Sequence, residues 1–371
     1  MEGDYIYSRS ICIATNANCN LQCTYCYETN KKNVDFDVNE AIDLLDKMLK
    51  EPTERGTKIK LHGGEPFLVF PKIKHLCETL WKNAYPEFFH IHITTNGTLV
   101  HGHIQEWLYK YRDKLTIKLS LDGNEKSHNT NRPNSFKSID TKFFINTWPN
   151  IRVNMTITPD TLPLISDNVI FIHSLGIKDI LAHFSLMTDW SKGKYEQIFY
   201  NQLILLVDFY LKHPHLKPWS FFTYDISRII DDEPYLAPCN IGQLKAYDFQ
   251  TRKYYPCHMF FPSVGGENLT DELTQIDLNT DKIEEECCIK CPFIKLCVTC
   301  YAENYIMRGS ISRRDMSLCS LQQINLVALF RFEYERLLHI NKPTPSDIRK
   351  MITIQKLHSQ ITEIEAKYNL K

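Results

Sequence analysis

Residues 18–27 read NCNLQCTYCY and place three cysteines, Cys19, Cys23 and Cys26, in one short loop. A structural zinc site takes four ligands and leaves no position open, and a cluster that only carries electrons is usually held by four cysteines. Three thiolates can hold three corners of a four-iron cluster and leave one iron exposed. The stretch therefore indicates an iron–sulfur cluster that binds a small molecule at its free iron.

Composition and charge narrow the class of protein. The chain has 371 residues, of which 43% are apolar and 23% charged, as in a globular enzyme large enough for two domains. A formal net charge of −1 gives no general attraction to nucleic acid or to an anionic membrane. The acidic N-terminal stretch lacks the apolar region of a signal peptide, and no apolar run reaches the length of a bilayer span. We expect a soluble, cytoplasmic protein without nucleic-acid or membrane partners.

The 13 cysteines are unevenly distributed. In a reducing cytosol, cysteines in such numbers are more often metal ligands or catalytic thiols than disulfide partners. One group lies near the start of the chain, and eight cysteines fall between Cys239 and Cys319. We therefore expect two metal-binding regions. Cys12, in an apolar strand, and the isolated Cys77 are expected to be buried thiols of the core.

The first half of the chain alternates between two patterns. Short β-rich runs predict strands at 10–15, 58–63, 90–95, 116–121, 152–158 and 179–186. Apolar residues at helical spacing lie between them at 39–50, 103–112 and 167–176. Six strand–helix units predict an α/β fold with a parallel sheet, a partial (β/α)6 barrel that falls short of the eight units of a complete one.

The rest of the chain predicts a cysteine-rich iron–sulfur extension and terminal helices. The expected boundaries are 1–190 for the partial barrel, 191–235 for a helical linker, 236–325 for the extension and 326–371 for the C-terminal helices. Thr344 is the expected N-cap of the last helix, with a proline at its first position. We expect one apolar face of that helix to pack within the protein: Ile348, Met351, Ile352, Leu357, Ile361 and Ile364.

Polar and glycine-rich loops follow four of the predicted strands. They are residues 19–26, HGGEP at 62–66, TNGT at 95–98 and SLDG at 120–123. Any one of them alone is adequately explained as turn chemistry. Because the carboxyl ends of parallel strands meet at one edge of a sheet, their recurrence predicts one shared site.

The motif Cys19-x-x-x-Cys23-x-Tyr25-Cys26, with GGEP after the next strand, resembles the signature of the radical S-adenosylmethionine enzymes. The resemblance covers the first half of the chain and implies S-adenosylmethionine as the ligand of the open iron. An electron from the reduced cluster would break its sulfonium C–S bond, and the resulting 5′-deoxyadenosyl radical would take a hydrogen from an unactivated C–H group. The cysteine loop would hold the cluster.

The resemblance also implies roles for single residues. Backbone groups of Gly63 and Gly64, with Glu65, would receive the amino group of the cofactor. Ser120 would bind the ribose and Arg132 the carboxylate. The expected cofactor-binding residues are Tyr25 near the adenine, Gly63, Gly64, Glu65, Asn96, Ser120, Arg132 and, from a neighbouring strand, Asn154.

The later cysteines resemble the seven-cysteine SPASM extension, which holds auxiliary iron–sulfur clusters in peptide- and protein-modifying radical enzymes. By this resemblance, one [4Fe–4S] cluster would be held by Cys288, Cys291, Cys297 and Cys319, and a second by Cys239, Cys257 and Cys300, with Cys287 or His258 as candidates to complete it. Three clusters are expected in total. The chain departs from the family pattern in having Arg252 where glycine is usual and in a Cys297–Cys300 interval that is one residue shorter.

The expected function is modification of a peptide or protein, with a ribosomally made peptide favoured and a crosslink or related C–H functionalisation as the product. The sulfatase-maturating branch, which forms formylglycine, is the alternative. That branch has an aspartate as the general base where this chain has His258. Three roles are open for His258: catalytic base, iron ligand, or hydrogen-bond donor to a cluster sulfur. A non-catalytic electron carrier or a zinc-binding adaptor is the alternative of another class, but neither needs the GGEP cofactor loop.

The expected partners are the peptide or protein substrate and a reducing protein such as flavodoxin or ferredoxin. Only about ten residues precede the first predicted strand. We therefore expect peptide recognition by a separate protein or by another mode of leader binding.

Overall fold

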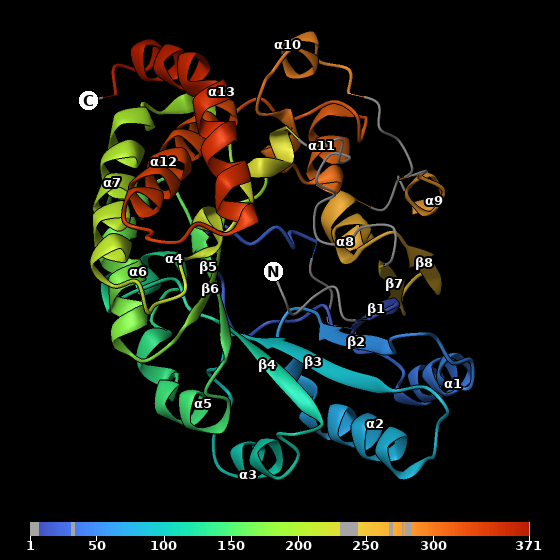
Figure 1. Ribbon diagram of the computed structural model, residues 1–371. Coiled ribbons are helices and arrows are strands. Elements are labelled where there is room, and N and C mark those ends of the chain that lie inside the picture. Colours follow the sequence, from blue (N-terminus) through green and yellow to red (C-terminus); the bar gives the residue numbers. More distant parts are fainter. Residues whose placement is uncertain are drawn as a thin grey trace.

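A single eight-stranded sheet organises the protein. The computed structural model describes residues 7–30, 34–230, 244–266, 270–276, 278 and 283–370. The strand order is β6-β5-β4-β3-β2-β1-β7-β8, and Figure 1 shows the sheet curving as a partial barrel. The six predicted strands are confirmed and pair in parallel: β1 (Arg9–Ala14), β2 (Thr57–His62), β3 (Phe89–Thr95), β4 (Leu115–Ser120), β5 (Arg152–Ile157) and β6 (Asp179–Phe184).

Helices cover the outer face of this sheet (Figure 1). They are α1 (Val38–Leu49), α2 (Phe70–Lys82), α3 (His103–Lys110), α4 (Glu125–Asn131), α5 (Thr141–Thr147), α6 (Ile165–Ser174) and α7 (Glu196–Lys212). Side chains alternate along a strand, so Ile59 and Leu61 enter the main apolar core under the helices. Lys58, Lys60 and His62 face the opposite, inner side of the barrel.

The extension is joined to the barrel through the sheet itself. Strand β7 (Leu244–Asp248) pairs in parallel with β1, and β8 (Lys253–Tyr255) returns beside it as an antiparallel hairpin. Arg252, in the turn of this hairpin, has φ +54°. That left-handed conformation favours glycine, which explains why the family usually has glycine where this chain has Arg252.

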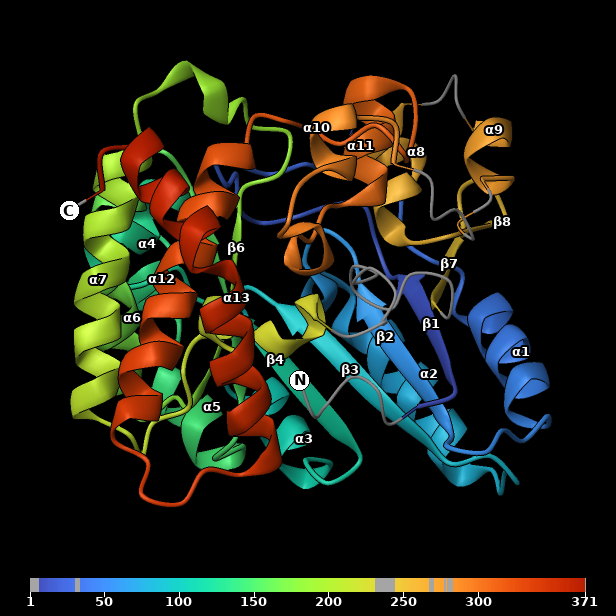
Figure 2. The same cartoon turned by 45° about the horizontal axis from the view of Figure 1, so that its top comes forward.

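Short helices make up the rest of the extension: α8 (Pro262–Gly265), α9 (Thr270–Thr274), α10 (Glu286–Ile289) and α11 (Tyr301–Arg308). Figure 2 shows α8, α10 and α11 grouped together on one side, apart from α7 and the C-terminal helices. Single 3₁₀ turns connect many elements: η1 (Pro66–Val69), η2 (Phe136–Ser138), η3 (Leu162–Leu164), η4 (Trp190–Lys192), η5 (Ser220–Phe222), η6 (Ile226–Ile229), η8 (His258–Phe260) and η10 (Ile294–Leu296).

Two long helices, α12 (Cys319–Leu338) and α13 (Pro345–Lys367), end the chain. The predicted cap of α13 is confirmed, because Thr344 and Asp347 form a reciprocal capping box. The predicted packing of α13 holds only for its second half, where Leu357 and Ile364 are buried. At its start Ile348, Met351 and Ile352 are 47%, 38% and 41% exposed, so the expectation of one buried face was wrong there. No helix within the described ranges is long and apolar enough to span a membrane.

Candidate active site

The three-cysteine loop follows β1 at the carboxyl edge of the sheet. Cys19, Cys23 and Cys26 are all half-buried. The loop turns tightly, with the Cys26 N–H donating to the Cys23 carbonyl at 3.2 Å. The Thr24 N–H donates at 2.9 Å to the carbonyl of Asn131, at the end of α4. The loop is therefore anchored to the fourth strand–helix unit as well as to the first.

Polar groups surround the cysteine sulfurs. Arg132 Nη1 lies 3.9 Å from Cys23 Sγ, and Asn96 Nδ2 lies 3.9 Å from Cys19 Sγ. Desolvation raises the pKa of the Cys23 thiol to about 11, and the charge of Arg132 acts in the opposite direction. A thiol in this setting ionises most readily when a metal competes with its proton.

The glycines of GGEP allow the second loop to pack against the first. A Cβ atom on Gly63 would lie 2.4 Å from the Asn16 carbonyl oxygen, and one on Gly64 would lie 1.9 Å from that of Asn18. Both distances are far below any real contact, and Gly63 also has φ +152°. The Glu65 N–H donates to the Asn18 carbonyl at 2.8 Å. Sequence reasoning had assigned these glycines to the approach of the ligand and had missed this packing.

Glu65 connects the loops that follow β2 and β3. Its Oε1 accepts hydrogen bonds from Thr95 Oγ1 at 2.7 Å and from the Phe67 N–H at 3.1 Å, and its Oε2 accepts from the Asn96 N–H at 2.8 Å. Burial raises the pKa of this carboxyl, while its donors lower it. The Glu65 carboxylate therefore ties the loop after β2 to the loop after β3.

Ser120 and Asn154 lie side by side at the ends of β4 and β5, where they are register partners. Ser120 is buried. The Oδ1 atom of Asn154 is also buried and has no hydrogen-bond partner among the described residues. Buried polar atoms are rarely left unpaired, so this pair is suited to a polar ligand such as a sugar hydroxyl.

A buried carboxylate, Asp122, organises the predicted residues Tyr25 and Arg132. The Tyr25 hydroxyl and Arg132 Nε each donate to Asp122 Oδ2 at 2.9 Å. The guanidinium carbon of Arg132 lies 5.3 Å from the centroid of the Tyr25 ring. Burial would raise the pKa of Asp122, but Arg132 and His128 hold it below its usual range. Sequence reasoning gave Asp122 no role of its own; its place in SLDG after the fourth strand was the available signal.

His258 extends from the extension toward the inner side of the barrel. Its ring centroid lies 4.4 Å from that of His62, at the end of β2, and 6.2 Å from that of Tyr27. Desolvation, His62, Lys60 and Lys118 together hold the pKa of His258 well below its usual value. Cys257 is buried in an apolar cluster against which Cys300 packs. Cys239, predicted to complete this group, lies outside the described residues.

The other extension cysteines influence one another. Desolvation raises the pKa of Cys297 to about 11; Arg314 opposes the shift, while Cys319 and Cys291 add to it. Cys288 is influenced in the same way by Cys287 and Cys297. The four residues predicted to share a cluster therefore lie near one another, with Cys287 exposed beside them. Within the described ranges no disulfide forms, and no three metal-binding side chains are grouped as a single-ion site.

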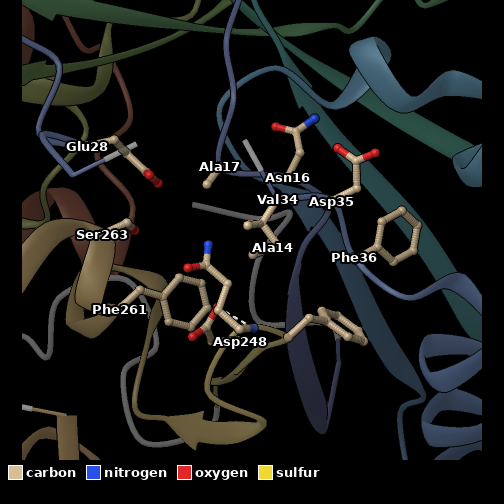
Figure 3. A pocket seen from close by; sticks show the side chains of 12 residues that line it. Ala14, Asn16, Ala17, Glu28, Val34, Asp35, Phe36, Asp248, Phe261 and Ser263 are labelled. Atoms are coloured by element: carbon tan, nitrogen blue, oxygen red, sulfur yellow. Dashed lines mark hydrogen bonds between the residues drawn. The ribbon is translucent and has the colours of Figure 1, made fainter. Parts of the chain in front are cut away.

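A separate hollow is lined by residues that precede and follow the cysteine loop in the sequence (Figure 3). Its walls include Glu28, Asp35 and Asp248, together with the aromatic side chains of Phe36 and Phe261. Its walls include none of the three loop cysteines and none of the residues predicted to bind the cofactor. One wall residue, Asn16, contacts the predicted residue Glu65, because its side-chain amide donates to the Glu65 carbonyl at 2.8 Å.

Curated proteins resemble parts of the chain. An uncharacterized protein of Methanocaldococcus jannaschii is 30% identical over 172 residues, 44% of this chain and 57% of the relative. A cysteine-type anaerobic sulfatase-maturating enzyme of Clostridium perfringens is 28% identical over 32% of this chain and 33% of the relative. The radical SAM cyclopropyl synthase TigE of Paramaledivibacter caminithermalis is 23% identical over 46% and 40%. The chain thus matches only about a third to just over half of each relative.

Solved structures match nearly the whole fold. Native anSMEcpe with bound AdoMet and Kp18Cys peptide has a TM-score of 0.65 at 18% identity, covering 89% of this chain and 98% of that one. Streptococcus suis SuiB bound to the precursor peptide SuiA has a TM-score of 0.58 at 19% identity, covering 84% and 76%. Identities this low establish a shared fold.

The sequence model of the radical SAM superfamily matches residues 13–148. This region contains the cysteine loop, the GGEP loop, Ser120 and Arg132. Radical SAM domains bind S-adenosylmethionine at a [4Fe–4S] cluster, which agrees with the three-cysteine loop. The chain therefore carries a radical SAM domain within residues 13–148.

Proposed function

We propose that this protein is a radical SAM enzyme that modifies a peptide or protein, with a ribosomally made peptide as the favoured substrate. The observation that carries the proposal is the meeting of the cysteine loop, the GGEP loop and the Ser120–Asn154 pair at one edge of the sheet. Together they offer three thiolates and a buried polar cradle. An electron carrier or a zinc adaptor has no use for that cradle.

The residues present fit the cofactor. In this proposal Cys19, Cys23 and Cys26 hold the cluster, and the unpartnered Asn154 Oδ1 and Ser120 receive the ribose hydroxyls. With S-adenosylmethionine bound and the iron–sulfur cluster reduced, the site would supply a 5′-deoxyadenosyl radical that abstracts hydrogen from the substrate. The protein side chains would bind and orient the cofactor.

Arg132 has two tasks in this proposal. Its Nε is fixed by Asp122, which orients the guanidinium, while Nη1 lies beside Cys23. The outer N–H groups of the guanidinium could then bind a carboxylate in its plane. Tyr25, held by the same Asp122, stays packed against Arg132 on the side assigned to the adenine.

The extension would hold two auxiliary [4Fe–4S] clusters, for a total of three. Cys288, Cys291, Cys297 and Cys319 would ligate one, and their mutual electrostatic influence supports this grouping. Cys257, Cys300 and Cys239 would ligate the other, with Cys287 or His258 as the candidate to complete it. The packing of Cys300 against the cluster that contains Cys257 supports this second grouping.

The choice of a ribosomal peptide over a sulfatase rests on His258. Its contact with His62 supports a structural role, and its lowered pKa makes it a weaker proton acceptor than an exposed histidine. Formylglycine formation is the second candidate, because a curated relative is a sulfatase-maturating enzyme. The partners would be a reducing protein such as flavodoxin or ferredoxin and, for leader recognition, a separate peptide-binding protein.

The test is reductive cleavage of S-adenosylmethionine by anaerobically reconstituted protein. Changing Cys19, Cys23 and Cys26 together to alanine should remove one cluster of iron and abolish 5′-deoxyadenosine formation. Cys77→Ala is the matched control, because Cys77 is a buried thiol of α2 in the main core. Cofactor cleavage that survives in the triple variant would refute the proposal.

A further inference from the structure

A short loop, residues 185–189, follows β6 at the carboxyl edge of the sheet, where the proposed site lies. It begins beside β5, because the Ser185 N–H donates to the Ile157 carbonyl at 2.8 Å. The next residues, Leu186 and Met187, pack against the apolar cluster of the extension that contains Cys257. The loop therefore links β6, at one end of the sheet, to the extension, which continues from β8 at the other end.

One buried carboxylate fixes this loop to the extension. Glu303, on α11, is only 5% exposed, and its Oε1 accepts a hydrogen bond from the Met187 N–H at 2.6 Å. Met187 has φ +57°, a left-handed conformation that residues with a side chain rarely adopt. Such a conformation persists where the surrounding structure holds it in place. The bond from Met187 to Glu303 is therefore a contact that keeps the loop in this conformation.

No cation balances the charge of Glu303 within the described ranges. The charged group that acts on it is Asp315, which is another carboxylate. A carboxyl group that is buried without a cation favours its protonated form. Desolvation raises the pKa of Glu303 to about 7; the Met187 N–H opposes this shift and Asp315 adds to it. Glu303 is therefore protonated in part of the molecules near neutral pH.

The other ionisable groups on the elements around Glu303 have partners of their own. His258, from the turn η8 that packs against α11, faces His62 at 4.4 Å. Cys300, at the start of α11, is a proposed cluster ligand whose negative charge would add to that of Asp315. The rest bond elsewhere: Asp189 to the Ser191 N–H, Tyr305 to Glu272, Arg308 to Glu285 and Arg314 to the Cys297 carbonyl. None of these described groups neutralises the Glu303 carboxylate.

We propose that Glu303 is a latch on the proposed active site, which holds the loop after β6 against the extension while protonated and releases it once ionised. The inference rests on the proposed function and concerns access to the same site. An ionised carboxylate regains its hydration when the loop opens, and one N–H donor does not offset that gain. Because the pKa is about 7 in the closed state and near 4.5 for an exposed glutamate, the opening equilibrium should rise about tenfold between pH 6 and pH 8.

The experiment is hydrogen exchange of single backbone amides in the full-length, anaerobically reconstituted protein at pH 6, 7 and 8. The observed exchange rate divided by the intrinsic rate at each pH gives the opening constant. The Met187 N–H reports on the latch directly, because it is the donor to Glu303. The Thr156 N–H is the internal control, since it donates at 2.9 Å to Asp122, whose lowered pKa keeps it ionised throughout this range. We expect the opening constant to rise about tenfold at Met187 and to stay constant at Thr156.

Variants assign the pH dependence to Glu303. Glu303→Gln keeps an oxygen that accepts from Met187 but has no proton to lose, so it should protect the Met187 N–H at pH 6 and show no rise at pH 8. Glu363→Gln, at an exposed position of α13, is the matched control and should keep the rise.

Three outcomes would overturn the inference: a constant opening at Met187 in the wild type, the same rise in Glu303→Gln, or an equal rise at Thr156, which would mean that the whole domain opens. Formation of 5′-deoxyadenosine by the wild type tests the proposed function separately, because the exchange measurement does not depend on cofactor cleavage.

Discussion

The imidazole rings of His62 and His258 lie 4.4 Å apart and join the end of β2 to the extension. His62 directly precedes the GGEP loop, and His258 directly follows the proposed cluster ligand Cys257. The two rings thus connect the proposed S-adenosylmethionine site to an auxiliary site through one contact.

The first prediction concerns His258. His258→Ala should alter the absorption or paramagnetic spectrum of the auxiliary clusters, because it removes a ring that packs beside Cys257. The wild-type enzyme should leave a Cys- or Ser-type sulfatase peptide unchanged. His215→Ala, at an exposed position, is the control and should leave the spectrum as it is. Formylglycine made by the wild type and lost in a His258→Ala protein with intact clusters would favour the sulfatase branch instead.

The second prediction separates radical formation from product formation. Changing Cys288 and Cys291 to alanine should leave some uncoupled cofactor cleavage while ending peptide modification. The lost cluster also helps to hold the extension folded, so circular dichroism must first show a native-like fold. Unimpaired peptide modification by a folded, cluster-depleted variant would contradict the proposed role of the extension.

The third prediction tests the packing of the two loops. Gly64→Ala would place a methyl group 1.9 Å from the Asn18 carbonyl oxygen and should displace the cysteine loop. We expect about 1–3 kcal/mol of lost stability and a loss of iron up to one cluster. Gly265→Ala is the control, since its Cβ would meet the ends of two side chains, Leu273 at 3.1 Å and Ile306 at 3.8 Å, and no backbone atom that close. Full iron content in Gly64→Ala would show that the loop tolerates the methyl group.

The fourth prediction concerns Asp122, which sequence reasoning had passed over. Asp122→Asn should leave the buried Arg132 without its counter-charge and lower stability by roughly 3–5 kcal/mol. Asp167→Asn, at an exposed position of α6, should change stability by less than about 0.5 kcal/mol. Urea unfolding measures both. A native-like midpoint in Asp122→Asn would show that Arg132 finds another partner.

The fifth prediction is a dependence of stability on pH. Burial lowers the pKa of His128 to about 4, below the value of 6.5 it has when exposed. The unfolded chain therefore binds a proton first as the pH falls, and stability should decline between about pH 6.5 and 4. From pH 7 to 5 this one group should account for roughly 2 kcal/mol. His128→Gln should reduce this loss by that amount in urea unfolding measured at pH 7 and pH 5, and an unchanged loss in the variant would contradict the prediction.

Sequence reasoning predicted the elements that repeat and missed those that depend on distant contacts. The six strands were recoverable because Ile59, Ile91 and Ile117 recur within short β-rich runs. The pairing of β7 with β1 could not be predicted, because the sequence of a five-residue strand does not indicate which strand it pairs with. The loops expected to bind the cofactor were found because they follow strands. The hydrogen bonds from Thr95 and Asn96 to Glu65 could not be predicted, because they depend on how two loops meet in space. The contact between His62 and His258 joins segments too far apart in sequence for any local pattern to predict.

The parallel pairing of β7 with β1 has a consequence for how the protein can be divided. Ser10 to Ile13 of β1 are each paired with residues of β7, so a chain cut before residue 244 would expose the edge of β1 along its whole hydrogen-bonding row. Bare edges of this kind recruit other chains and aggregate. A truncation that keeps only the radical SAM region should therefore aggregate more readily than the full chain.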